Sequence, residues 1–341
     1  MATIKDVAKL AGVSASTASR ALHDSSMISE ATKERVRQAM AELDYSPNYS
    51  ARNLVNRQTN TVGIVLPVRE SQDSLGNNPF FMQIIQGISS ICSENNYMVS
   101  LASGRTNEEL KKNIETLIRS GNIRKIIFLY SKKGDPVFHY VKKQQNVTCV
   151  VVGEAYEKSG SNIRYVDNNN IQAGQDAGDF LIAKGYREIV FASTDMAELV
   201  QAQRYQGYCQ SLAALGLKEE NLTLSRIDAQ GNIRHLQKFL AVYPNVQAFV
   251  ACDDIMAIRL QRLFKETDQS AADYAIIGFN NSWVAEIASP ALTSVDIFPY
   301  ELGEKAANLL LKPLKKENKE KEPVIIPHQI VERESTPTRV E

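Results

Sequence analysis

The chain has few cysteines and histidines, and neither kind is arranged for a disulfide framework or a metal site. Its 341 residues include four cysteines, with no Cys-x-x-Cys pair, and four dispersed histidines. In a reducing compartment such thiols stay free. We therefore expect buried, reduced cysteines and no bound metal; the cysteines are Cys92, Cys149, Cys209 and Cys252.

Long hydrophobic runs and an excess of one charge are missing too. The N-terminus has no apolar signal core, and no run approaches membrane-spanning length, so we expect a cytoplasmic protein without a membrane partner. The 39 basic residues balance the 39 acidic ones. Residues 1–57 carry eight basic against six acidic side chains, an excess too small to reveal a nucleic-acid binder.

Enzyme motifs are absent as well. The sequence contains no Gly-x-Gly-x-x-Gly, Walker loop or nucleophile elbow. We therefore expect no enzymatic activity and no cofactor.

The first 22 residues have the pattern of two helices joined by a tight turn. Thr3 and Asp6 form a capping-box-like pair, and Gly12 ends the first helix where a positive φ is cheap. Ser14 then caps a second helix over 15–22. The apolar stripe of the first helix is Ile4, Val7, Ala8 and Ala11.

The second helix divides into an inner and an outer face. Its inward residues are Ala18, Ala21 and Leu22, whereas Ser16, Thr17, Ser19 and Arg20 remain outside. Short hydrogen-bonding side chains and one guanidinium can read base edges in the major groove. This layout is typical of a DNA-binding helix-turn-helix.

Two further segments complete the N-terminal region. Ser29 is expected to cap a third helix that runs to Leu43 and buries Val36 and Met40. Pro47 can open a short helix that ends near residue 54. A helix of about two turns is unstable alone, so it should form only when DNA or a partner chain holds it.

These segments resemble the lactose/purine repressor family of bacterial transcription factors, and the resemblance covers the whole chain. The further landmarks are residues 78–81 (Asn-Pro-Phe-Phe), 166–168 (Val-Asp-Asn), 204–208 (Arg-Tyr-Gln-Gly-Tyr), 253–257 (Asp-Asp-Ile-Met-Ala), 277–279 (Ile-Gly-Phe) and 290–294 (Pro-Ala-Leu-Thr-Ser). Residues 78–81, 129–131 and 165–167 are also similar to the maltose-operon repressors of Gram-positive bacteria.

After residue 61, apolar strand-like runs alternate with helical stretches, which predicts parallel sheets covered by helices on both faces. The resemblance implies an α-helical helix-turn-helix domain and an α/β effector domain with two lobes, like periplasmic sugar-binding proteins. The expected boundaries are 1–46 for the DNA-binding domain, 47–60 for the hinge helix and linker, and 61–341 for the effector and dimerisation domain. Lobe one would be 61–161 with 293–322, and lobe two 162–292 with 323–341.

The resemblance assigns DNA contacts to both N-terminal segments. Ala15, Ser16 and Arg20 take the specificity positions: an alanine methyl suits a thymine methyl, and arginine suits guanine. A phosphate contact or a surface ion pair is the alternative for Arg20. The full expected set is Thr3, Ser14, Ala15, Ser16, Thr17, Ser19, Arg20, Asn48, Ala51, Arg52, Leu54 and Val55, in which Ser14, Thr17 and Ser19 better fit phosphate contacts or capping.

Leu54 is an apolar residue at the end of a polar-flanked helix. In the family, two such leucines of a dimer wedge into the minor groove and kink the operator. The alternative is that Leu54 packs under the effector domain. Val55 stands where some members have lysine, so one minor-groove cation is missing.

The resemblance also implies an effector cleft between the lobes, with Phe80, Phe81, Tyr130, Arg204, Asp253 and Asn280 as the expected binding residues. We expect one phenylalanine to line the cleft and the other to belong to the core, and one of Asp253 and Asp254 to cap a helix. Asn280 stands where many members have aspartate, and Glu198 where some have a second arginine. These differences favour a neutral sugar over an anionic or purine effector.

Together these observations predict a homodimeric, nucleoid-associated repressor of a sugar-utilisation operon. Its partners would be operator DNA, a second copy of the chain and a small sugar, with maltose or maltodextrin the first candidate. Residues 334–341 cannot form a heptad seam, so we expect no tetramer. The alternatives are a family regulator controlled by a phosphorylated phosphocarrier protein and one that takes another small ligand.

Overall fold

The computed structural model describes residues 2–22, 24–45, 59–68, 78–154, 162–226, 228–267, 273–312 and 323–339. The chain divides into two compact units, residues 1–58 and 59–341. No helix in the described parts has both the length and the apolar character needed to cross a membrane.

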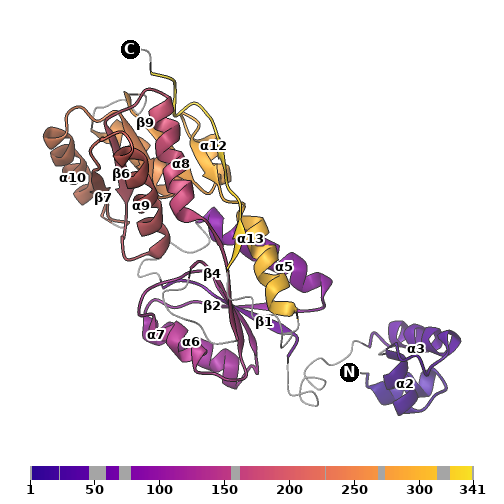
Figure 1. The fold of residues 1–341 in the computed structure, drawn as a ribbon. Coiled ribbons are helices and arrows are strands. Elements are labelled where there is room, and N and C mark those ends of the chain that lie inside the picture. Colours follow the sequence, from indigo (N-terminus) through magenta and orange to yellow (C-terminus); the bar gives the residue numbers. More distant parts are fainter. Residues whose placement is uncertain are drawn as a thin grey trace. The chain divides into compact units, whose positions relative to one another are not determined.

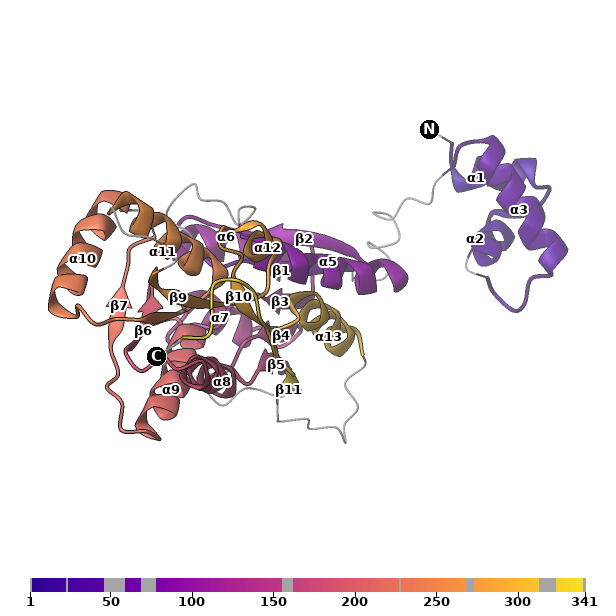
Figure 2. The same cartoon turned by 90° about the horizontal axis from the view of Figure 1, so that it is seen from above.

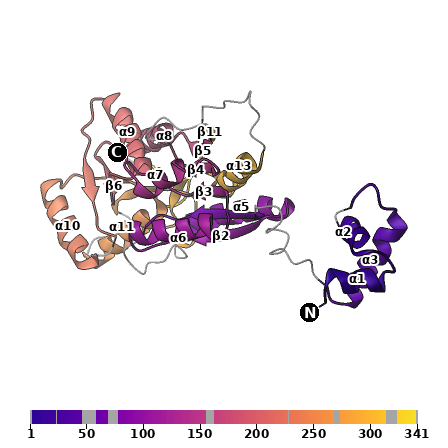
Figure 3. The ribbon, with the colours of Figure 1, turned by 90° about the horizontal axis from the view of Figure 1, so that it is seen from below.

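In the N-terminal unit, the described residues 2–22 and 24–45 form three short helices that pack on one another (Figure 3): α1 (Ile4–Leu10), α2 (Ala15–Leu22) and α3 (Glu30–Glu42). Thr3 and Asp6 form the capping box of α1, because the Thr3 amide donates to Asp6 Oδ2 at 2.8 Å and the Asp6 amide to Thr3 Oγ1 at 3.4 Å. Gly12 has a φ of +66° in the turn that follows. Ser29 precedes α3, but its hydroxyl pairs with that of Thr32 at 2.9 Å and caps no amide.

Small buried side chains allow the three helices to approach closely. Val7 and Ala18 are fully buried, and Ala21 and Val36 nearly so. A core of this size provides little stability, so the shape of the unit depends on the caps and on alanines at the crossing points.

The larger unit is built on two sheets, one above the other in Figure 1. The first has the order β11-β5-β4-β3-β1-β2, with β1 (Thr61–Val65), β2 (Met98–Ala102), β3 (Lys125–Phe128), β4 (Thr148–Val152), β5 (Ile163–Asn168) and β11 (Val324–Ile326). The second has the order β12-β10-β9-β8-β6-β7, with β6 (Ile189–Ser193), β7 (Asn221–Thr223), β8 (Ala248–Ala251), β9 (Ala275–Phe279), β10 (Thr293–Asp296) and β12 (Gln329–Val331). Every pairing is parallel except that of β10 with β12.

Helices cover both faces of each sheet. The first lobe has α5 (Pro79–Glu94), α6 (Asn107–Arg119), α7 (Pro136–Lys142) and α13 (Pro299–Leu311). The second has α8 (Asn170–Ala183), α9 (Leu199–Ala213), α10 (Ala229–Val242), α11 (Asp254–Glu266) and α12 (Trp283–Ile287). Figure 2 shows α8 and α9 on one side of the second sheet and α10 and α11 on the other. The predicted parallel, helix-covered sheets are thus confirmed.

The chain crosses between the sheets three times, at other residues than those expected from the sequence. The expected boundaries placed 162–168 and 324–326 in lobe two and 293–296 in lobe one. Strand pairing reverses these assignments, because β5 and β11 belong to the first sheet and β10 to the second. The residues of β10, Thr-Ser-Val-Asp, do not form an apolar run that would indicate a buried strand. Thr293 and Ser294 are nevertheless fully buried, and their hydroxyls form hydrogen bonds with other buried side chains.

Glycines set the distance between paired helices in both lobes. A Cβ atom on Gly207 of α9 would lie 1.8 Å from the Ile171 carbonyl oxygen of α8, and one on Gly174 of α8 would lie 2.1 Å from the Arg204 carbonyl oxygen. The α8–α9 contact therefore fixes the backbone of Arg204 against α8.

Gly207→Ala should destabilise the larger unit, because the added methyl group overlaps a carbonyl oxygen that cannot rotate away. Overpacking of this kind typically costs about 1–3 kcal/mol, and we expect a loss at the upper end in urea unfolding. Gly63→Ala is the matched control: its Cβ would meet only side-chain atoms at 3.5 Å or more. Equal stability of the two variants would contradict the close helix contact.

Candidate functional site

The outer face of α2 presents the side chains that the sequence assigned to base contacts. Ala15, Ser16, Ser19 and Arg20 are exposed and Thr17 is half-buried. The Ser14 hydroxyl accepts the Thr17 amide at 3.1 Å, so Ser14 is a helix cap. No described acidic side chain pairs with Arg20, so the ion-pair alternative finds no partner in that part of the chain. Asn48, Ala51, Arg52, Leu54 and Val55 lie outside the described residues.

Arg20→Ala should weaken binding to the operator by about 1–3 kcal/mol and relax preference at one base pair per half-site, if the guanidinium reads guanine. Binding to a randomised DNA pool, followed by sequencing, measures both effects. Arg35→Ala, at an exposed arginine of α3, is the control and should keep the base preference. A uniform loss on all sequences would instead identify Arg20 as a phosphate contact.

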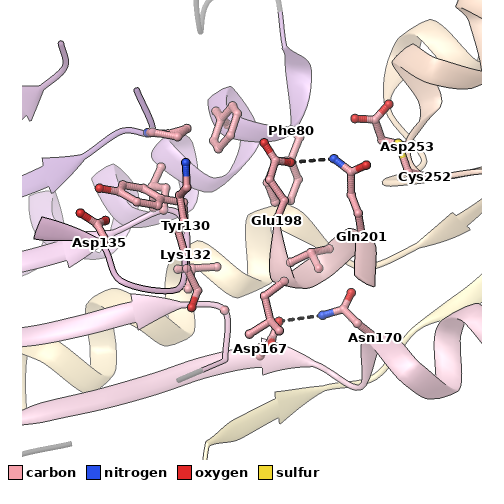
Figure 4. Close-up of a pocket in the computed structure, with 18 of the residues that line it drawn as sticks. Phe80, Tyr130, Lys132, Asp135, Asp167, Asn170, Glu198, Gln201, Cys252 and Asp253 are labelled. Carbon is pink, nitrogen blue, oxygen red and sulfur yellow. Dashed lines mark hydrogen bonds between the residues drawn. The ribbon is translucent and has the colours of Figure 1, made fainter. Parts of the chain in front are cut away.

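A cavity of about 250 Å³ lies in the larger unit, between the two lobes at the carboxyl ends of their strands. Figure 4 shows side chains from both lobes converging on it: Phe80, Tyr130 and Lys132 from the first, and Glu198, Gln201 and Asp253 from the second. All six residues expected from the sequence contribute to its lining: Phe80, Phe81, Tyr130, Arg204, Asp253 and Asn280.

The two phenylalanines follow a helix start that fixes their directions. The Asn78 side chain accepts the Phe80 amide at 3.1 Å, and Pro79 opens α5. The rings of Phe80 and Phe81 meet edge to face at 5.1 Å. Phe81 is only 5% exposed and belongs to the core, whereas Phe80 is half-buried and presents more surface to the cavity.

Arg204 lies under the cavity with part of its hydrogen-bonding capacity in use. Its Nε donates to Asn170 Oδ1 at 3.1 Å and its Nη1 to the Cys252 carbonyl at 2.7 Å. The guanidinium also lies 4.3 Å from the centre of the Phe279 ring. Burial lowers the pKa of Arg204 to about 10, so it remains charged at neutral pH. Its Nη2 donates to no described residue, which leaves N–H groups for a ligand.

Asp253 and Asn280 supply an acceptor and an amide beside Arg204. Asp253 caps α11, with Oδ1 accepting the Met256 amide at 2.7 Å, and its Oδ2 accepts from no described side chain. As expected, capping involves only one of the two adjacent aspartates, because Asp254 is 1% exposed and instead binds the hydroxyls of Ser282 and Ser294. Asn280 has a φ of +103° and its side-chain amide has no described partner.

The lining includes polar residues that the sequence analysis did not select. Asp167, within the Val-Asp-Asn landmark, accepts from Asn170 at 3.1 Å. Asp135 caps α7, is 5% exposed and lines the cavity. The Asp-Pro pair at a helix start could have identified Asp135 from the sequence. Gln201 has no such signal, since no neighbouring residue shows that it faces a cavity.

Glu198 lies in the lining but is not a lone negative charge. Its Oε2 accepts from Arg226 at 2.8 Å and from Gln201 at 2.7 Å. The lining contains four cationic residues, Lys132, Lys133, Arg204 and Arg226, against four acidic ones, Asp135, Asp167, Glu198 and Asp253. Charged side chains of both signs are thus mixed in the lining, which disfavours a strongly charged ligand.

The lobes touch at the rim of the cavity. The backbone of Lys132 in the first lobe forms an isolated β-bridge with that of Glu198 in the second. The Gln203 amide of α9 also donates to the Glu154 carboxylate, beyond β4. These contacts cross the cleft, so a change in the lobe angle must break or reform them.

Two buried carboxyls connect stability to pH. Burial raises the pKa of Asp167 to about 7 and that of Asp254 to about 6, against 3.8 ordinarily. The folded protein thus keeps protons that the unfolded chain releases above pH 4. This stabilisation is complete below about pH 4 and is lost as the pH rises to 7.

Asp167→Asn should therefore flatten the fall in unfolding free energy between pH 5 and 8, and stabilise the ligand-free protein at pH 8 by up to a few kcal/mol. Urea unfolding across this pH range measures the slope. Asp195→Asn, at an exposed position, should keep the wild-type slope. An unchanged slope in Asp167→Asn would show that Asp167 is ionised throughout.

Comparisons with known proteins cover both units. Residues 3–48 match the model of bacterial regulatory proteins of the lacI family, and 179–336 the periplasmic binding protein-like domain. The chain is 32% identical to the HTH-type transcriptional regulator MalR of Streptococcus pneumoniae, over 97% of this chain and 99% of that one. A solved complex of the regulator CelR with cellobiose is 28% identical, with a TM-score of 0.71 over 98% of this chain and 100% of the other. The operator-bound lac repressor, at 23% identity and a TM-score of 0.81 over 98% and 99%, shares the fold.

Proposed function

Because the chain belongs to the lacI family of bacterial regulatory proteins, we propose that it represses a sugar-utilisation operon and that a small neutral sugar in its cleft controls operator binding. It is a DNA-binding transcriptional regulator and not an enzyme. Maltose or a short maltodextrin is the first candidate for the sugar.

The observation that carries the proposal is the balanced, hydrogen-bonding lining of the cleft. Sugars offer hydroxyls, which donate and accept, and apolar C–H faces, on which aromatic rings pack. The cleft offers both kinds of partner: the free N–H groups of Arg204, the amide of Asn280 and Oδ2 of Asp253, with the rings of Phe80 and Tyr130. Charge-assisted bonds from Arg204 and Asp253 to hydroxyls would orient the sugar.

The relatives support a sugar effector, and maltose is the first candidate among them. A second MalR, from Staphylococcus xylosus, is 30% identical over 99% of both chains. A solved structure described as a probable maltose operon transcriptional repressor is 25% identical, with a TM-score of 0.74. The CelR complex contains cellobiose, a disaccharide of the same size as maltose. A disaccharide-sized ligand is therefore the first class to test.

On the DNA side, we propose that a homodimer places two α2 helices in adjacent major grooves of a pseudo-palindromic operator. Leu54, outside the described residues, would wedge into the minor groove between them. Exposed apolar side chains on the larger unit suit contact with a second copy. On β2, an edge strand, Met98 and Leu101 are 72% and 53% exposed, and on α12 Trp283 and Ile287 are 59% and 69% exposed.

Control by the sugar requires that it bind one lobe arrangement better than the other. A ligand with equal affinity for both would shift nothing, however tightly it binds. A coupling free energy of about 1–3 kcal/mol between the sugar site and the DNA site, which is typical of allosteric proteins, would change operator affinity by roughly 5- to 150-fold.

Thermal unfolding with a panel of ligands tests the proposal. Maltose, maltotriose, guanine and a phosphorylated phosphocarrier protein are each added, and a ligand at 100 times its Kd should add about 2.7 kcal/mol to the stability. We expect maltose or maltotriose to raise the midpoint. A shift with the phosphocarrier protein alone would replace the sugar proposal, and a shift with guanine alone would contradict the choice of a neutral ligand.

A further inference from the structure

One buried side chain, Asn168, touches all three segments that connect the lobes. The first crossover leaves β5 at Asn168 and enters α8, the second joins β10 to α13 through residues 297 and 298, and the third joins β11 to β12 through residues 327 and 328. Asn168 is 4% exposed and is the last residue of β5.

Its amide nitrogen binds the backbone of the other two crossovers. Nδ2 donates to the carbonyl of Ile297 at 3.1 Å in the second. It also donates to those of Ile326 at 3.1 Å and Pro327 at 3.4 Å, where the third begins. A rotation of one lobe against the other changes backbone angles in these segments, so it must strain or break these bonds.

Asn168 itself contributes to the lining of the cavity and is within two hydrogen bonds of Arg204. Arg204 Nε donates to Asn170 Oδ1 at 3.1 Å, and Asn170 Nδ2 lies 3.3 Å from the Asn168 carbonyl oxygen. Asn170 Nδ2 also donates to Asp167 Oδ1, and the same oxygen accepts the backbone N–H of Asn168 at 2.8 Å. A ligand that engages Asp167 therefore acts on a direct hydrogen-bond partner of Asn168, and one that engages Arg204 acts on Asn168 through Asn170.

We propose that Asn168 is a positioning residue that couples occupancy of the cleft to the angle between the lobes. It ties the three crossovers to one another, so that they move together between two arrangements rather than independently. This role rests on the proposed effector function and adds the residue through which the effector would act.

The test compares Asn168→Asp with Asn169→Asp in the full-length protein. The first replaces the donor by a carboxylate that repels three carbonyl oxygens. The second makes the same chemical change at the adjacent, exposed N-cap of α8, whose side chain accepts the Gln172 amide at 3.1 Å. Aspartate caps as well as asparagine, so this control leaves the crossovers intact.

The first readout needs no ligand. Spin labels on unnatural side chains at exposed Lys112 of α6 and Lys238 of α10 report the distance between the lobes. We expect a broader distance distribution in Asn168→Asp and the wild-type distribution in Asn169→Asp. If Asn168→Asp does not fold, Asn168→Ala replaces it, because it removes the donor without adding charge. A wild-type distribution in the Asn168 variant, or equal broadening in both variants, would overturn the proposal.

The second readout separates binding from coupling. Maltose affinity is measured by calorimetry. Affinity for an operator sequence selected from a randomised DNA pool with the wild-type protein is measured with and without maltose. The Asn168 variant should keep its maltose Kd within about fivefold, while its operator response falls from roughly 5- to 150-fold to about one. If the variant loses maltose affinity together with the operator response to maltose, Asn168 is a ligand contact and the proposed coupling role is wrong. If the wild type itself ignores maltose, the sugar proposal fails, and the interlobe distances alone decide the role of Asn168.

Discussion

Arg204→Met should leave a folded protein that still binds operator but no longer responds to sugar. The expected loss of ligand affinity is about 2–5 kcal/mol, because the guanidinium supplies charge-assisted hydrogen bonds in a site shielded from water. Methionine can fill space beside Phe279, but the Cys252 carbonyl and Asn170 Oδ1 lose their donor, so we expect some loss of stability as well. Calorimetry with maltose, and operator binding with and without it, measure the two effects.

The control for this variant is Arg333→Met in the same lobe. Arg333 is also largely buried, donates to the Leu292 carbonyl at 2.9 Å and to Asn281 at 2.7 Å, but does not line the cavity. We expect it to lose some stability and keep its sugar affinity. Full sugar response in Arg204→Met would remove Arg204 from the binding site.

Leu54→Ala should cost a few kcal/mol of operator affinity, roughly two orders of magnitude, and reduce the bend of the operator. Alanine shortens the proposed wedge but favours helix, so the hinge loses no local propensity. Non-specific, salt-dependent binding should persist, since it arises from phosphate contacts. Energy transfer between the ends of a labelled operator measures the bend.

Sensitivity to the central base step should fall in the same variant, because an easily unstacked step helps only if it is unstacked. Leu215→Ala, at a leucine that is 56% exposed in the other unit, is the control and should bind and bend DNA like the wild type. Unchanged affinity and bend in Leu54→Ala would leave Leu54 as a packing residue.

Local signals predicted the elements that depend on local chemistry. The capping box at Thr3, the turn at Gly12 and the alanines of α2 are all set by neighbours in sequence, and the structure has them where expected. Phe80 and Asp253 were assigned to the cleft through the family resemblance, and each stands beside a helix start.

Features that depend on contacts distant in sequence were missed. The Arg226 partner of Glu198 is 28 residues away, so the sequence did not show that the charge of Glu198 is paired. The burial of the polar residues in β10 could not be predicted from neighbouring residues, because their hydrogen-bond partners Asp254 and Thr336 lie about 40 residues away on either side. The observed crossovers differ from the expected boundaries for the same reason, since only strand pairing shows which sheet a short strand joins.

The central claim is that one sugar site and one DNA site share a free energy of coupling. The most direct test measures operator affinity with and without saturating maltose, and maltose affinity with and without operator, on the same full-length protein. Linkage requires the two ratios to be equal, and we predict a common value of roughly 5- to 150-fold. Maltose that binds the cleft and leaves both ratios at one would contradict the claim.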